Sequence, residues 1–257
     1  MSAIRAAALA VTAVAAPAAA TTFSFASDFA SSQFTFEDGA ANAVPVDLLI
    51  DDENGVFSTL SIKAEFSGRF ALSSLVESVE VMPGLFVHNY WVRSPFFDFK
   101  GDLDGDGVFT DTLMTVSASD AAQTVLGTSD TWGSSGGIFG GPGSNGSAVR
   151  AVTYSVEQTL IDYIDTELGA NAADYGLFAG DSIDNSADFA FTLTNIQPDP
   201  ILGAPGPLGL DSLGRPDRPW VSEGSFSGTA RFIPAPAAAA MLLGGFGLTS
   251  RRRRSHN

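Results

Sequence analysis

Three aspartates at alternate positions form the chemically most distinctive stretch of this 257-residue chain. One residue separates Asp102 from Asp104 and Asp104 from Asp106, and Gly107 follows directly. Carboxylate oxygens are the ligands that a hard cation such as calcium prefers, and a glycine permits the sharp turn that wraps them around one ion. The spacing therefore predicts a structural calcium site, with a solvated acidic turn as the alternative.

The segment that begins at Asp102 resembles the calcium loop of EF-hand proteins, whose first six positions it matches as Asp-x-Asp-x-Asp-Gly. Leu113 stands where that family has a bidentate glutamate, so another oxygen would have to complete the shell. The residues that fit later positions of the loop are Val108, by its carbonyl, and Thr110, and the carboxylates considered for completion are Asp111, Asp51, Asp52 and Glu53. Because Pro95 and several phenylalanines precede the loop, we expect an isolated calcium loop between strands and not a paired helical sensor.

A nucleophile elbow is formally present, because residues 133–137 match Gly-x-Ser-x-Gly. An elbow requires a strand before the serine and a helix after it, whereas more glycines follow here. Loss of the C-terminal tail would also leave His88 as the single histidine. We therefore assign no catalytic residue. Two carboxylates among the 29 acidic residues would still suffice for a polysaccharide hydrolase, which is the alternative function.

Aromatic residues near the acidic loop allow a glycan-binding interpretation. Tyr90, Trp91 and Trp132 would stack on sugar rings if they were exposed, as in carbohydrate-binding modules built on β-sandwiches. Aromatic residues at strand spacing more often belong to the core. The exposure of these three rings decides between the two interpretations.

Period-two alternation over residues 60–72 is the clearest sign of secondary structure. Short strands, frequent turns and one helix predict a mainly β fold, an antiparallel β-sandwich of jelly-roll type. The single amphipathic helix is expected over 156–168, with a capping box at Ser155 and a C-cap at Gly169. Seven glycines between residues 133 and 147 predict an exposed loop and a subdomain boundary.

Both ends of the chain carry the features of export signals. Arg5 precedes an apolar run over 6–16, and small residues at 18–20 offer an Ala-x-Ala cleavage site, so residues 1–20 are predicted to be a signal peptide. At the other end, a Pro-x-Pro motif leads into an apolar run that stops at an arginine cluster. The motif residues are Ile233, Pro234, Ala235, Pro236 and Ala237, and the cluster is Arg251, Arg252, Arg253 and Arg254.

This C-terminal arrangement resembles the PEP-CTERM sorting tails of bacteria, in the Val-Pro-x-Pro-Ala variant with Ile233 in place of valine. The resemblance implies export, recognition and cleavage by an exosortase-type membrane enzyme, and delivery to the cell surface or exopolysaccharide of a Gram-negative-type bacterium. The apolar stretch 237–249 is shorter than the roughly 20 residues of a spanning helix, so we expect transient membrane insertion of the tail.

Composition restricts the partners of the remaining domain, residues 21–232, which precedes the tail 233–257. Loss of both ends would leave 8 basic and 29 acidic residues, a net charge of −21, which disfavours nucleic acid. The chain has no cysteine, so disulfides and thiolate metal sites are excluded. We expect a non-enzymatic surface protein, calcium-stabilised, that serves adhesion, matrix structure or glycan binding. Association with exopolysaccharide is the expected partner interaction.

Overall fold

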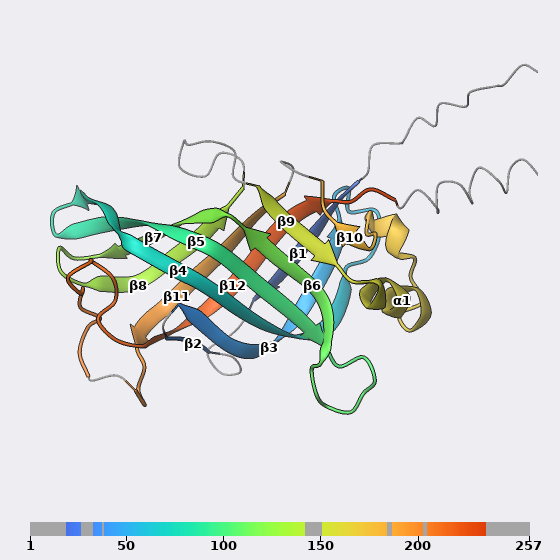
Figure 1. Cartoon of the computed structure of the whole chain (residues 1–257), viewed down its shortest axis with the longest axis horizontal. Coiled ribbons are helices and arrows are strands. Elements are labelled where there is room, and N and C mark those ends of the chain that lie inside the picture. Colours follow the sequence, from blue (N-terminus) through green and yellow to red (C-terminus); the bar gives the residue numbers. More distant parts are fainter. Residues whose placement is uncertain are drawn as a thin grey trace, which may run out of the picture.

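The structure is a computed structural model of the chain, and it describes residues 19–26, 33–37, 39–141, 151–183, 187–202 and 205–234. Most of the predicted signal peptide and of the predicted sorting tail lies outside these residues. The fold is mainly β, as the alternating patterns predict (Figure 1). The strands are β1 (Ala20–Ala26), β2 (Phe34–Glu37), β3 (Ala40–Asp52), β4 (Leu60–Met82), β5 (Leu85–Gly101), β6 (Asp111–Ala118), β7 (Asp120–Gly127), β8 (Trp132–Gly140), β9 (Val152–Val156), β10 (Gly180–Asp181), β11 (Asp188–Pro198) and β12 (Trp220–Arg231).

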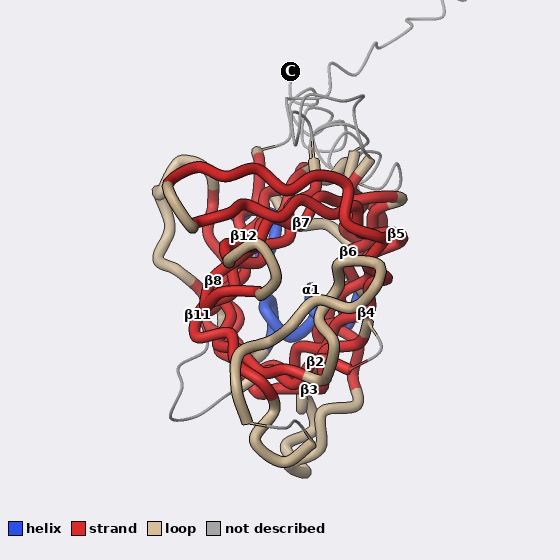
Figure 2. Tube along the Cα trace, turned by 90° about the vertical axis from the view of Figure 1, so that its left-hand side faces the viewer, coloured by secondary structure: helices blue, strands red, loops and turns tan. Residues whose placement is uncertain are grey.

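All of these strands belong to one antiparallel sheet, whose pairings form a closed circuit. Around the circuit, β12 pairs with β11, then β8, β7, β5, β4, β3 and β1 follow, and β1 pairs with β12 again. Strand β2 also lies between β12 and β3, beyond the end of β1. Figure 2 shows the strands surrounding a common interior. The predicted sandwich of two sheets is therefore not confirmed, whereas the antiparallel β class is.

The sheet forks along β5. Residues 86–93 of this strand pair with β7, and residues 96–101 pair with β6. Ser94 lies at the fork with a left-handed backbone (φ 47°), and Pro95 follows it. Because proline has no N–H to donate to a ladder, it is suited to the point where β5 changes its partner. Beyond β6, the branch continues through β9 and β10.

Phenylalanines fill the interior of the circuit. Phe25, Phe66 and Phe226 come from three strands, and each is at most 3% exposed. The ring centroids of Phe25 and Phe66 are 4.7 Å apart, and those of Phe66 and Phe226 are 6.0 Å apart. Phe97 and Phe191 extend the same cluster from β5 and β11. Burial of one such side chain stabilises the fold by about 1.5–3 kcal/mol, so this cluster is the main support of the sheet.

The glycine-rich segment is a strand and not the exposed loop that its composition predicts. Strand β8 pairs with β7 on one side and β11 on the other, so residues 133–140 are part of the sheet. Its glycines make room for aromatic rings. A Cβ at Gly137 would lie 2.5 Å from the ring of Phe139, and one at Gly140 would overlap the ring of Phe189. Residues 142–147 lie outside the described part of the chain.

Helix α1 (Gln158–Thr166) is shorter than predicted and lies at one end of the sheet, followed by the short 3-10 helix η2 (Ala172–Tyr175). The predicted capping box is wrong, because Ser155 pairs within β9 and the N-cap is Glu157, which makes no side-chain cap. Leu160 and Ile164 are buried, as the amphipathic pattern predicts. Gly169 has a left-handed backbone (φ 63°) just beyond the helix, as predicted. Neither described helix is long and apolar enough to cross a membrane.

Candidate functional site

The acidic loop connects β5 to β6 and projects from the sheet in Figure 1. The last pair of the two strands is Gly101 with Asp111, so the loop closes a β-hairpin. The prediction that it lies between strands and not between helices is confirmed. Leu113, at the position where an EF-hand has glutamate, is fully buried on β6 and supplies no ligand.

The structure brings the three predicted aspartates together. One carboxylate oxygen from each of Asp102, Asp104 and Asp106 lies within 4.8 Å of the others, which is the spacing of ligands around one cation. Backbone N–H groups hold the loop in this shape. Gly107 N–H donates to Asp102 Oδ2 over 2.9 Å, and Val108 N–H donates to Asp106 Oδ1 over 2.8 Å.

Asp102 carries a second oxygen whose environment is unusual. Its Oδ1 atom is inaccessible to solvent and has no hydrogen-bond partner among the described residues. A buried polar atom without a partner costs about 1–3 kcal/mol, and a cation bound to this oxygen would remove that cost. The donor set, three carboxylates on a tight turn, fits calcium better than a softer metal.

The other predicted calcium ligands of the loop are Val108, Thr110 and Asp111. Val108 and Thr110 lie in the loop with exposed side chains. Asp111 uses Oδ2 to accept the N–H of Leu103 over 3.3 Å, and it is not one of the three clustered residues. The carboxylates that cluster among the described residues are those of Asp102, Asp104 and Asp106.

The carboxylates of residues 51–53 make hydrogen bonds and an ion pair outside the acidic loop. Asp52 accepts three backbone N–H groups, and those of Val56 and Phe57 hold its pKa below the usual value. Asp51 accepts the hydroxyl of Thr59, and Glu53 pairs with Arg231 over 3.2 Å. None of these three belongs to the carboxylate cluster of the acidic loop, so the structure gives no support to the prediction that one of them completes the calcium shell.

The predicted glycan-contact residues do not share an exposed face. Tyr90 is 1% exposed and Trp132 is 3% exposed, whereas Trp91 lies on the opposite side of β5 and is half-buried. The Trp132 indole N–H donates to the Tyr90 hydroxyl over 2.9 Å, and that hydroxyl donates to the carbonyl of Gly214. Burial raises the pKa of Tyr90 to about 12. Tyr90 and Trp132 belong to the interior, so the condition of exposure on which the glycan-binding interpretation depended is not met for these two rings.

No elbow surrounds the Gly-x-Ser-x-Gly match, because residues 133–137 lie within the paired strand β8. His88 is fully buried on β5, with Nε2 2.8 Å from the carbonyl oxygen of Thr128. Its Nδ1 lies 3.0 Å from the hydroxyl of Ser78, the residue directly opposite on β4. This contact was not foreseen from the sequence. It joins β4 to β5, and neither Ser78 nor His88 lines the two cavities described below, so we interpret it as a strand-pair contact.

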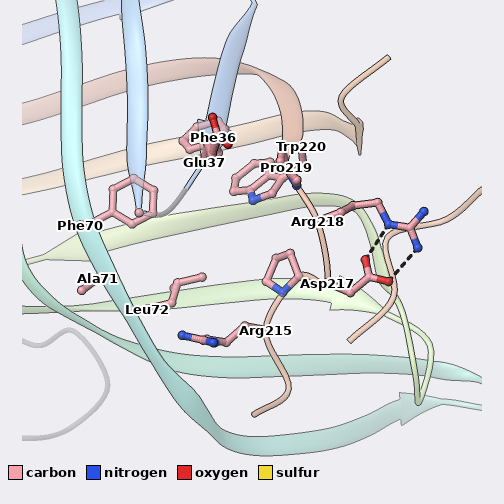
Figure 3. A pocket seen from close by; sticks show the side chains of 12 residues that line it. Phe36, Glu37, Phe70, Ala71, Leu72, Arg215, Asp217, Arg218, Pro219 and Trp220 are labelled. Atoms are coloured by element: carbon pink, nitrogen blue, oxygen red, sulfur yellow. Dashed lines mark hydrogen bonds and ion pairs between the residues drawn. The ribbon is translucent and has the colours of Figure 1, made fainter. Parts of the chain in front are cut away.

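Trp220 marks a cavity that the sequence did not indicate. The cavity, here called the Trp220 pocket, has a volume of about 460 Å³ (Figure 3). Its aromatic wall is Phe36, Phe70 and Trp220, and the rings of Phe36 and Trp220 are stacked 3.8 Å apart. Asp217 lines the same pocket, and its hydrogen bond from Arg218 holds the Asp217 pKa below the usual value. The only hint in the sequence is a tryptophan at the boundary between a proline-rich segment and the final strand.

Comparison with known proteins finds no matching family model, no matching curated protein and no matching solved structure.

Proposed function

We propose that this chain is an exported, calcium-stabilised protein of the bacterial cell surface or exopolysaccharide, sorted by an exosortase-type enzyme and without catalytic activity of its own. Adhesion, matrix structure and glycan binding are the roles within this class. The observation that carries the calcium part is the cluster of Asp102, Asp104 and Asp106 with the partnerless Oδ1 of Asp102. The sequence features at the two ends of the chain support export and sorting.

The placement of the two ends supports the same proposal. Ala20, at the start of β1, is the register partner of Arg231, at the end of β12. Glu53 accepts hydrogen bonds from the backbone N–H of Ala20 and from the Arg231 guanidinium. The start of β1 and the end of β12 therefore lie side by side. Leader and tail can be processed there without crossing the sheet, although the predicted leader includes Ala20 itself.

The hydrolase alternative gains no support from the pocket that contains carboxylates. A glycosidase needs one carboxyl that stays protonated as the acid and a second as base or nucleophile. Asp217 is paired with Arg218 over 2.7 Å and is held ionised, so it is unsuited to the acid role. We therefore favour binding over cleavage.

The export part is tested by the intact mass of the protein recovered from the surface of its native host. A mass that lacks the leader and the tail beyond the Pro-x-Pro motif supports the proposal. The full translation product in the cytosol would overturn it.

The non-enzymatic part is tested with the host's own exopolysaccharide. The recovered protein should sediment with the polymer, and the reducing ends of the polymer should not increase during incubation. Steady release of reducing sugar would favour the hydrolase instead.

A further inference from the structure

Two arginines stand apart from the other cations of this acidic protein. Seven lysines and arginines are described, and five of them lie within 4.0 Å of a carboxylate. Arg69 and Arg93 are the two for which no such ion pair occurs among the described residues. Both line one cavity of about 580 Å³, here called the arginine groove.

The fork in the sheet places these side chains together. Arg69 lies opposite Phe96 in the β4–β5 register, and Arg93 lies opposite Ala71, so the two arginines come from neighbouring strands. Both side chains are exposed. Ser94 and Ser117 line the groove where β6 takes over from β7, which adds hydroxyl groups beside the guanidinium groups. The volume is within the usual range of small-molecule sites, about 300–1,000 Å³.

Local contacts fix the orientation of Arg69 and the backbone conformation of Ser94 in the groove. The Arg69 guanidinium carbon lies 5.1 Å from the centre of the Phe96 ring, a cation–π contact that orients its planar fork. Ser94 has a left-handed backbone (φ 47°), which is uncommon for a residue with a side chain. Its N–H donates to the carbonyl of Ser119 over 2.9 Å, which fixes that conformation. Strained backbone of this kind recurs at binding sites.

The charge around the groove favours an anion. None of its lining residues among the described part of the chain is acidic. Asp120 is the register partner of Arg93 on β7, yet the two form no ion pair. Glu37 lines the neighbouring Trp220 pocket and not this groove. Two exposed guanidinium groups therefore face a concave surface free of described carboxylates, in a domain that is otherwise strongly acidic.

We infer that the arginine groove binds a carboxylated sugar unit of an acidic polysaccharide. This inference rests on the proposed function and specifies its ligand. The guanidinium group matches the geometry of a carboxylate with two parallel hydrogen bonds. The serine hydroxyls suit the hydroxyl groups of a sugar, and Phe96 offers an apolar surface beside them. A carboxylate between Arg69 and Arg93 would provide both with an ionic partner that neither has among the described residues.

The test measures binding of oligogalacturonate, a polymer of carboxylated sugars, to the full processed protein by calorimetric titration. We expect Arg69→Gln and Arg93→Gln each to weaken binding by about tenfold or more, the effect of losing one charge-assisted hydrogen bond of about 1.5–3 kcal/mol. Arg93→Lys should be intermediate, because it keeps the charge and loses the planar fork. Lys63→Gln removes an equal charge outside the groove, at a lysine paired with Asp47, and should bind as the unaltered protein does.

Three further ligands separate the sources of affinity. Neutral dextran should not bind, and dextran sulfate and polyglutamate should bind at least tenfold more weakly than oligogalacturonate. Equal binding of dextran sulfate would indicate a general anion site, and equal binding of polyglutamate would indicate a peptide partner. Either result, absence of oligogalacturonate binding, or unchanged affinity in both arginine variants would overturn the inference.

Calcium requires its own control, because it can bridge a polyuronate to an acidic protein. Titrations in calcium and in chelator, with Asp104→Asn as a matched variant, separate such bridging from binding in the groove. We expect the effect of the two arginine variants to persist in chelator. Loss of all binding in chelator while the protein stays folded would contradict the role of the groove. A negative result in these titrations would not contradict the proposed surface location, because the intact mass of the recovered protein tests that location separately.

Discussion

Calcium should raise the melting temperature of the processed protein, and the size of the increase follows from the ligands. The cluster supplies three carboxylates and lacks the bidentate glutamate of an EF-hand, because Leu113 is buried in the core. A site of this kind belongs with the weak extracellular calcium sites, whose Kd is about 0.1–1 mM. The free energy that calcium adds to folding is RT ln(1 + [Ca]/Kd), about 1.4 kcal/mol when calcium is at about ten times Kd.

That free energy converts to a modest thermal shift. For a domain of this size, 1 kcal/mol changes Tm by about 2–4 °C, so we expect an increase of about 3–6 °C. Each further tenfold rise in calcium should add a similar amount, since the dependence is logarithmic. Magnesium should have a smaller effect, because it retains its water and requires stricter geometry.

Differential scanning calorimetry in calcium and in chelator measures this shift, and Asp104→Asn provides the sharper comparison. In calcium the variant should melt below the unaltered protein, because one ligand is lost. In chelator it should melt at the same temperature or higher, because one of three neighbouring like charges is gone. Glu77→Gln removes an exposed carboxylate of β4 and should leave the calcium response unchanged. Equal melting of the unaltered protein in calcium and chelator would refute the calcium site.

Three other predictions concern the sheet and its interior. Phe226→Ala should lower the free energy of unfolding by about 3–5 kcal/mol in denaturant titration, because Phe226 is 1% exposed at the centre of the phenylalanine cluster. Gly140→Ala should cost about 1–3 kcal/mol, because its Cβ would overlap the ring of Phe189; a neutral result would contradict the close packing of β8. The raised pKa of Tyr90, about 12 against the usual 10.0, means that the unfolded chain loses this proton first. Tyr90 should therefore contribute stability below pH 10 that is lost between about pH 10 and 12, and Tyr90→Phe should remove this component from the pH dependence of unfolding.

Alternation of apolar and polar residues correctly predicts which side chains are buried where one face of a strand is covered. Residues 60–72 alternate, and Ile62, Ala64 and Phe66 are buried within β4 as the pattern predicts. The same holds for Phe226 and Ala230 in β12. The closure of the sheet could not be predicted, because pairing between β1 and β12 joins residues about 200 positions apart, and no local pattern specifies such a partner.

The roles of the β8 glycines and of Pro95 depend on neighbours that are distant in the sequence. The glycines of 133–140 indicate a loop by composition, but in the structure they accommodate rings such as Phe139 and Phe189. Pro95 lies within β5, which continues through it at the point where the strand changes partner. In both cases, a distant neighbour determines what the residue does.

Only the part of the candidate sites whose residues lie close together in the sequence could be predicted. The aspartate loop lies within six residues and could be found from spacing alone, whereas the arginine groove joins Arg69 to Arg93 across a strand pair. Tyr90 and Trp132 could not be distinguished from exposed aromatics, because their burial depends on residues of other strands.

The pairing of Ala20 with Arg231 would have a mechanical consequence under the proposed attachment to a surface. β12 runs 12 residues from Trp220 to Arg231, a rise of about 36 Å at roughly 3.3 Å per residue. Any load applied through the tail would pull on the last hydrogen bonds of one central strand, which both flanking strands hold. With the proposed attachment through the tail, Trp220 and the pocket it lines would stand at the end of β12 that is remote from the attachment point.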